Sequence, residues 1–443
     1  MYNVLVDIII IVSKVNGREL EVSEITNYSK EQLIALKEEL EKQYAEYMSR
    51  QLKLDMSRGK PAGSQLDVTN GILDALESYI TEDGLDARNY GVLDGIPEAK
   101  RLFSELLNIP TEKIIIGGNS SLNLMYDTMV RLCLFGTQGH TPWSKLPVVK
   151  FLCPSPGYDR HFAICEDLGI EMITIPMKEY GPDMELVEDL VANDETIKGI
   201  WCVPLYSNPQ GICYSDEVVE RLATMKTAAP DFRIFWDNAY GVHHIYAEEK
   251  LADIFELAEK VGNEDRVYYF FSTSKITFPG AGVALMASSL SNVAEIKKHM
   301  GIQTIGHDKI NQLRTVHYFK NAEGVRVHMK KLAEELKPKF DIVLKTLERE
   351  LAGTGLATWT KPLGGYFVAI DTYEGCAKET VALAKAAGVV MTGAGATFPY
   401  KKDLHDRNIR IAPTYPTTDE LQIAMDLFCV CVKLAGVNKL LAN

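Results

Sequence analysis

The chain has 443 residues, of which 46% are hydrophobic and 24% are charged, so it can bury a large core and holds two or three domains. Its 60 acidic residues outnumber the 47 basic ones and give a net charge of −13. This balance argues against binding to nucleic acid or to an anionic membrane surface, because both need a basic protein face.

The cysteines and the N-terminus indicate a cytoplasmic protein. Eight cysteines in a chain of this length, with no pair of CxxC units, predict neither a disulfide scaffold nor a zinc site, and no metal is expected. Cys429 and Cys431 are expected to pack in the core. Residues 1–12 are apolar but too short to span a bilayer, and either a short strand or an upstream extension of a shorter natural start is expected there.

Two helices are predicted before the middle of the chain. Ser29 and Gln32 form a capping box ahead of leucines at helical spacing, which predicts a helix over 29–50. A second helix is predicted over 70–80.

The middle of the chain alternates apolar runs with amphipathic segments. Seven runs of strand length occupy residues 113–118, 148–153, 171–177, 197–205, 232–238, 267–273 and 282–288. Helix-length segments separate most of them, so we predict an α/β fold with a mostly parallel seven-stranded sheet covered on both faces. Only residues 274–281 separate the last two runs, so the run 282–288 is expected to be antiparallel to its neighbour in sequence or to lie elsewhere in the sheet.

A smaller α+β domain is predicted after the sheet. A long helix over 325–351 leads into it, and strands are expected at 359–370 and 409–416. The predicted division is an N-terminal segment that joins the small domain, a large domain, and a small C-terminal domain: residues 1–70, 71–325 and 326–443.

Polar side chains gather where the predicted strands end, and open α/β sheets bind ligands at that edge. These residues are Asn119, Ser120, Ser121, Tyr158, Asn208, Asp237, Tyr240, Ser274 and Lys275. The set suits pyridoxal phosphate. That cofactor needs a lysine for a Schiff base, a carboxylate at its ring nitrogen, donors at its ring oxygen, an aromatic ring to stack on and a helix N-terminus for its phosphate.

Several motifs carry a resemblance to a known family. Short motifs resemble those of the fold-type I, class I/II aminotransferases: Asn208-Pro209-x-Gly211, Asp237-x-x-Tyr240, Ser272-x-Ser274-Lys275 and Arg410-Ile411. Longer segments are similar to those of bacterial aspartate aminotransferases of subgroup Ic: 57–67, 89–103, 117–127, 272–285 and 409–416. The resemblance implies the fold-type I fold, a large domain that binds pyridoxal phosphate, and a homodimer. It also implies transfer of the amino group of aspartate to 2-oxoglutarate by ping-pong chemistry.

The resemblance implies a role for each residue around the cofactor ring. Lys275 would form the Schiff base and carry a proton between the substrate Cα and the cofactor C4′. Asp237 would keep the ring nitrogen protonated, and Tyr158 would stack on the ring. Tyr240 and Asn208 would hydrogen-bond the ring oxygen.

The phosphate and the substrate would be held by other residues. The phosphate contacts implied are Asn119, Ser120, Ser121, Ser272, Ser274 and, from the partner subunit, Tyr90. Arg410 would clamp the substrate α-carboxylate in a bidentate manner, with Asn208 and Gly59 beside it.

The chain departs from the family at one point. Many relatives carry an arginine eight or nine residues after the lysine as a phosphate counter-charge, and here those positions are Val283 and Ala284. Either serines and the helix dipole suffice, or another cation comes from elsewhere. Lys309 and Arg314 are candidates for contacting a distal substrate carboxylate; the alternative for both is a surface or interface charge.

Three other functions use the same residues. The first is an aminotransferase for another amino acid, such as an aromatic one or alanine, and the second is a pyridoxal-phosphate lyase. The third is the effector domain of a transcription regulator, which would need a DNA-binding module in the roughly 55 residues before Arg58.

Overall fold

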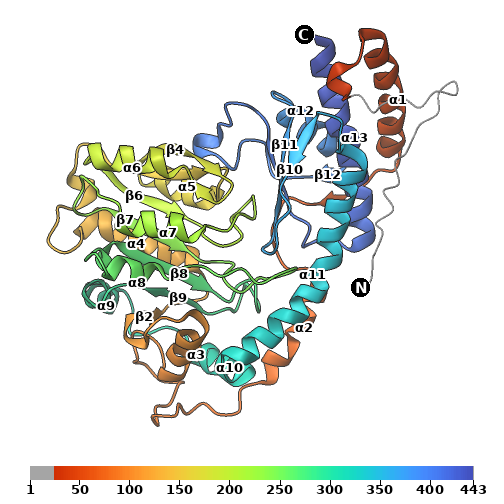
Figure 1. Ribbon diagram of the computed structural model, residues 1–443. Helices are drawn as coiled ribbons and strands as arrows, with labels where there is room; N and C mark the ends of the chain where they lie inside the picture. Colours follow the sequence, from red (N-terminus) through yellow and green to blue (C-terminus); the bar gives the residue numbers. More distant parts are fainter. Residues whose placement is uncertain (1–23, 443) are drawn as a thin grey trace, which may run out of the picture.

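The computed structural model describes residues 24–442, and its centre is an eight-stranded sheet with the order β2-β9-β8-β7-β6-β3-β4-β5 (Figure 1). The seven predicted strands are β2 (Ile114–Ile116), β3 (Lys150–Ser155), β4 (Glu171–Lys178), β6 (Ile197–Cys202), β7 (Arg233–Asp237), β8 (Val267–Ser272) and β9 (Ala284–Ala287). The eighth strand, β5 (Gly181–Pro182), pairs antiparallel with β4 and is too short to leave a hydrophobic pattern. As predicted, β9 is antiparallel to β8; it is also antiparallel to β2.

Side chains alternate between two hydrophobic cores, one on each face of this sheet. In β7, Ile234 and Trp236 belong to one core and Phe235 to the other. The first core is completed by the helices α3 (Pro97–Leu107), α6 (Met184–Asn193), α7 (Asp216–Thr224), α8 (Ile254–Glu259) and α10 (Lys309–Phe319). The second is completed by α4 (Ser121–Phe135), α5 (Asp159–Asp167) and α9 (Leu290–Gln303).

A further core lies in the C-terminal part of the chain. It contains a three-stranded antiparallel sheet of β10 (Ala357–Trp359), β11 (Val368–Thr372) and β13 (Asn408–Ile411), and the helices α12 (Ala377–Ala386) and α13 (Thr418–Ala442). Figure 1 shows α11 (Ala322–Leu351) running from the side of α10 to this part, as the predicted helix over 325–351 requires. Cys429 and Cys431 are fully buried here, which confirms their predicted packing role.

The chain before residue 70 contacts this C-terminal core. The predicted capping box of Ser29 and Gln32 is present at the start of α1 (Lys30–Ser49), and the hydroxyl of Tyr44 on α1 donates to Leu383 O at 2.8 Å. The strand β1 (Leu54–Asp55) pairs parallel with β12 (Val389–Val390). The division of the chain at residues 70 and 325 stays a prediction.

Local predictions failed where tertiary partners or proline overrode the pattern. The helix predicted over 70–80 is only a 3-10 turn, Asn70–Asp74, because the next backbone groups bond elsewhere: Glu77 N–H donates to Nδ1 of His317. The strand predicted over 359–370 is interrupted around Pro362, so that Trp359 ends β10 and Val368 begins β11.

The strand expected at residues 1–12 lies outside the described residues. Within residues 24–442, no helix has both the length and the apolar character that crossing a bilayer requires. The helix α2 (Gly63–Val68) completes the elements that position the site.

Candidate active site

The carboxyl ends of neighbouring strands bring the predicted ring contacts together. Asp237 is the last residue of β7, which pairs parallel with β8, and Lys275 follows the end of β8. The Nζ of Lys275 lies 4.7 Å from the ring centroid of the buried Tyr240. Asn208 follows β6 and is also buried. An amine, a carboxylate, a phenol and an amide therefore meet at one edge of the sheet.

One oxygen of the Asp237 carboxylate is left free. The side chain is buried, and its Oδ2 lies 3.0 Å from Nε2 of His161. Its Oδ1 is also buried and has no hydrogen-bond partner within residues 24–442. Because an unpaired buried carboxylate oxygen is costly, this atom is suited to receive an N–H from a bound heterocycle.

His161 is a site residue that the sequence analysis missed. Its ring stacks on Trp201 with centroids 4.3 Å apart and an interplanar angle of 8°, which fixes its orientation toward Asp237. The Tyr158 ring meets the same imidazole edge-on at 4.9 Å. Tyr158 and His161 are three residues apart at the start of α5, and this spacing on one helix face was the available signal.

The two tyrosines of the site keep their protons at neutral pH. Burial raises the pKa of Tyr158 to about 12, against the opposing effect of the Lys275 ammonium. Burial also raises the pKa of Tyr240 well above its ordinary value, and the Asp237 charge adds to this effect. Both phenols can therefore donate a hydrogen bond to a bound ligand.

Arg410 on β13 reaches the same edge from the C-terminal core. Its Nη1 donates to Asn208 Oδ1 at 3.2 Å and to Asp159 Oδ1 at 3.3 Å, and its Nη2 donates to Thr392 Oγ1 at 3.2 Å. The guanidinium lies 4.8 Å above the ring of Phe367. Its Nε is buried and unpartnered in the described part of the chain. Arg410 thus presents a cation that an incoming carboxylate can engage.

Gly59 lies against the same aromatic ring. A Cβ at this position would clash with Phe367, so a side chain here would displace the ring on which Arg410 rests. The preceding segment is tied to the site through Thr392, whose hydroxyl donates to Ser57 O at 2.8 Å. Asp159 and Thr392, like His161, were not predicted; no spacing or motif marks them.

The predicted phosphate contacts converge on the start of α4. Ser272 Oγ donates to Ser274 Oγ at 3.2 Å, and Ser274 Oγ donates to the backbone carbonyl of Asn119 at 3.1 Å. Ser120 is the N-cap residue of α4, and its side chain makes no capping hydrogen bond to the described residues, so the first backbone N–H groups of the helix are free. Such an arrangement favours an anion.

Tyr90 is set apart from the other predicted site residues. Its side chain is 79% exposed in the single chain. The adjacent Gly91 carbonyl accepts a hydrogen bond from Nζ of the buried Lys309 at 3.0 Å. Lys309 therefore holds the loop of Tyr90, whereas Arg314 faces a cavity next to Asn119.

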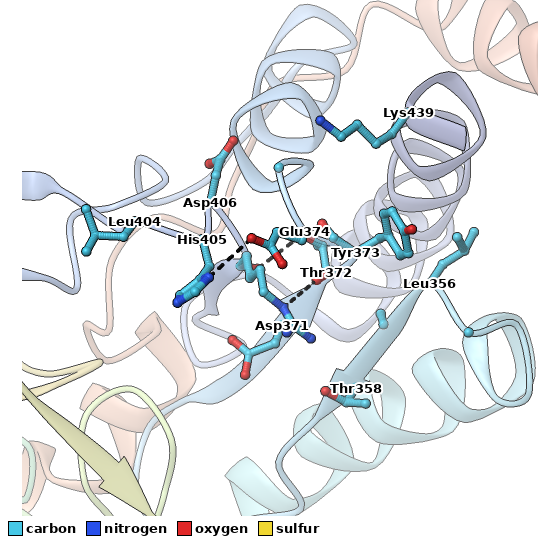
Figure 2. Close-up of a pocket in the computed structure, with 14 residues that line it drawn as sticks. Leu356, Thr358, Asp371, Thr372, Tyr373, Glu374, Leu404, His405, Asp406 and Lys439 are labelled. Carbon is cyan, nitrogen blue, oxygen red and sulfur yellow. Dashed lines mark hydrogen bonds and ion pairs between the residues drawn. The ribbon is translucent and has the colours of Figure 1, made fainter. Parts of the chain in front are cut away.

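The C-terminal part has a polar hollow of about 630 Å³ between β10, β11 and the loop before β13 (Figure 2). His405 and Glu374 form an exposed ion pair at its rim. None of the predicted site residues, all of which lie within residues 24–442, lines this hollow.

Comparison with known proteins identifies the family. The family model described as aspartate amino-transferase matches residues 28–443. The chain belongs to the aspartate aminotransferase family. The aspartate aminotransferase of Corynebacterium glutamicum is 45% identical over 94% of this chain and 96% of its own length. A Mycolicibacterium smegmatis protein, whose name places it among the aminotransferases, is 49% identical over 94% of this chain and 98% of its own length.

The fold agrees with this assignment. The crystal structure of an aspartate transaminase from Corynebacterium glutamicum superposes with a TM-score of 0.92 at 44% identity, covering 95% of this chain and all of that one. The chain is therefore an aminotransferase of fold type I, as its motifs predicted. Its family implies pyridoxal phosphate as the cofactor, and the free Oδ1 of Asp237 fits the protonated ring nitrogen of that group.

Proposed function

We propose that this aminotransferase moves the amino group of L-aspartate to 2-oxoglutarate by ping-pong chemistry, as a cytoplasmic homodimer that holds pyridoxal phosphate at Lys275. The observation that carries the proposal is the meeting of Lys275, Asp237 and Arg410 at one edge of the sheet. Aspartate is supported by the name of the 45% identical Corynebacterium relative.

The residues around Lys275 would hold the cofactor ring. When bound, pyridoxal phosphate supplies an aldehyde that takes up the amino group and a protonated ring that stabilises negative charge at Cα. Asp237, oriented by His161, holds the proton on the ring nitrogen through its free Oδ1. Tyr158 would cover the ring, and Tyr240 and Asn208 would donate to the ring oxygen. The residues that would hold the phosphate are at and near the start of α4: Asn119, Ser120, Ser121, Ser272 and Ser274.

Lys275 moves the proton. Its Nζ lies 4.7 Å from the centroid of the Tyr240 ring, and with the cofactor bound this amine would take the proton from the substrate Cα and deliver it to the cofactor C4′. The Lys275 amine can act first as base and then as acid because it holds the proton between the two transfers.

Arg410 orients the substrate by its α-carboxylate. A planar guanidinium matches a carboxylate with two parallel hydrogen bonds, while Asn208 and Gly59 complete the pocket. Asp159 Oδ1, which lies 3.3 Å from Nη1, occupies part of this fork before the substrate binds. The substrate therefore displaces Asp159 from Arg410.

The homodimer is supported by Tyr90. Its ring is exposed in the single chain while Lys309 holds its loop, so the ring is available to a neighbouring subunit, and the family resemblance assigns it to that subunit's phosphate. A cytoplasmic location is supported by the eight cysteines, all of which are free.

The test is transfer of labelled nitrogen in two separate half-reactions. Holoenzyme mixed with ¹⁵N-aspartate alone should release about one oxaloacetate per subunit, and 2-oxoglutarate added next should recover the label in glutamate. The Lys275→Ala holoenzyme is the matched control and should do neither. Release of ammonia or carbon dioxide in place of stoichiometric oxaloacetate would contradict transamination and favour lyase chemistry.

A further inference from the structure

The strand that carries the phosphate-binding arginine in relatives is here buried on both faces. Val283 packs in one core of the central sheet and Ala284 in the other, and both are almost fully inaccessible. Neither side chain carries a charge, so this strand supplies no cation. A cation for the phosphate therefore has to come from another element.

A cavity of about 400 Å³ adjoins the predicted phosphate contacts. One side is backbone at the end of β2 and before α4, at Gly117, Gly118 and Asn119. A second side is the segment 280–283, which follows Lys275. The third side is α10, which contributes Asp308, Ile310, Asn311, Gln312 and Arg314. Asn119 belongs both to this cavity and to the hydrogen-bonded serine cluster, since Ser274 Oγ donates to its carbonyl at 3.1 Å.

Arg314 brings a positive charge to this cavity and has no anionic partner within residues 24–442. Its Nη2 donates to the neutral acceptors Asn311 Oδ1, at 2.5 Å, and Ala281 O, at 3.5 Å. Its Nε is buried and has no partner among the described residues. Asp308 also lines the cavity, but its carboxylate caps α10 by accepting from Asn311 N at 2.9 Å. A half-buried guanidinium with a free N–H is stabilised by an anion.

Gly282 connects Arg314 with the serine cluster. Its carbonyl accepts from Asn311 Nδ2 at 2.7 Å, which ties it to α10. A Cβ at Gly282 would lie 3.3 Å from the backbone nitrogen of Ser274 and 3.1 Å from Thr273 Oγ1. Gly282 therefore lies close against the turn that carries Ser274, where a side chain would be crowded, and its carbonyl links that turn to α10.

We propose that Arg314, from α10, supplies the counter-charge of the cofactor phosphate through the cavity that it shares with Asn119, and takes the place of the arginine missing at 283 or 284. This inference rests on the proposed function, because it presupposes that pyridoxal phosphate is bound. It assigns Arg314 to the phosphate and not to a distal carboxylate of the substrate. Lys309 is not assigned this role, because it does not line the cavity and its amine donates to the Gly91 carbonyl instead.

The test compares binding of pyridoxal phosphate and of pyridoxal, which lacks the phosphate, to the full chain freed of cofactor. Arg314→Gln should weaken binding of pyridoxal phosphate by roughly 10- to 100-fold and change binding of pyridoxal by less than about twofold. Arg314→Lys, which keeps the charge, should lose only part of that affinity. Arg326→Gln is the matched control, because Arg326 is an exposed helical arginine paired with Glu323, and it should bind both ligands as the wild type does.

The outcomes separate this inference from the proposed function. If the wild type binds pyridoxal phosphate and Arg314→Gln binds it equally well, the assignment of Arg314 is wrong while the proposed function stands. If the wild type does not bind the cofactor at all, both fail. If Arg314→Gln binds the cofactor as the wild type does but its KM rises for aspartate and not for alanine, the assignment of Arg314 to the phosphate is overturned. Arg314 would then contact the distal carboxylate of the substrate. Inorganic phosphate gives a second readout: it should raise the Tm of the cofactor-free wild type more than that of Arg314→Gln, and equal shifts would overturn the inference.

Discussion

Replacing Asp237 by asparagine removes one negative charge and leaves the size of the side chain almost unchanged. In the structure this carboxylate is 2% exposed, held on one side by His161 and free on the other. The variant should keep the fold and most of the cofactor affinity, because the phosphate contacts and Lys275 are untouched. It should lose turnover, because the cofactor ring nitrogen loses the anion that keeps it protonated.

The geometry sets the size of the effect. At 3.0 Å, the distance that Asp237 Oδ2 keeps from His161 Nε2, a carboxylate attracts a cation by about 5 kcal/mol at an effective dielectric constant of roughly 20. This corresponds to a fall of about 4 units in the pKa of the ring nitrogen. Because the catalytic rate depends on a fraction of this change in the pKa of the ring nitrogen, kcat should fall by about 10²- to 10⁴-fold.

The assay measures kcat and the dissociation constant of pyridoxal phosphate on the same preparations. Asp231→Asn is the control. Asp231 is a second buried aspartate, just before β7, paired with Lys198 at 2.7 Å and with Trp143 at 2.9 Å. That variant should lower Tm and keep kcat, because the pair lies away from the carboxyl end of β7. An unaltered kcat in Asp237→Asn, together with lost cofactor binding, would refute the reasoning and make Asp237 a structural residue.

Three further predictions concern neighbouring groups. Lys275→Ala should fold normally by circular dichroism and lose at least ~10³-fold in kcat, because the same amine is both the nucleophile and the proton carrier. A kcat near that of the wild type would exclude Lys275 as the catalytic residue. Asp159→Asn should lower KM for both substrates by about fivefold at unchanged kcat, because the half-exposed Asp159 competes with the substrate carboxylate for Arg410. A raised KM would instead mean that Asp159 positions Arg410. Tyr90→Phe should release cofactor faster without changing the dimer mass by light scattering, and a fully active monomer would contradict the shared site.

Much of the site could be predicted because chemistry follows strand ends in this fold. Asp237 ends β7 and Lys275 follows β8, so the parallel pairing of two apolar runs was enough to bring the carboxylate and the amine to one edge. The antiparallel direction of β9 followed from the short segment before it, which has no room for a crossover helix.

The rest depended on contacts between distant segments. The spacing of His161 from Tyr158 placed both on one helix face, but a histidine there also resembles any core residue, and its role depended on finding Asp237 3.0 Å away. Arg314 is far in sequence from the predicted phosphate contacts, and only the fold shows the cavity that it shares with Asn119. The prediction of a helix over 70–80 was wrong for the same reason, because His317 accepts a hydrogen bond from the backbone N–H of Glu77.

The most direct test of the account is kcat/KM for aspartate against alanine, phenylalanine and kynurenine, with 2-oxoglutarate as the acceptor. The account predicts that aspartate is preferred by at least about tenfold, a difference of ~1.4 kcal/mol in the transition state. If a neutral or aromatic donor exceeds aspartate by about tenfold, the chain remains an aminotransferase but the acidic-substrate proposal is contradicted.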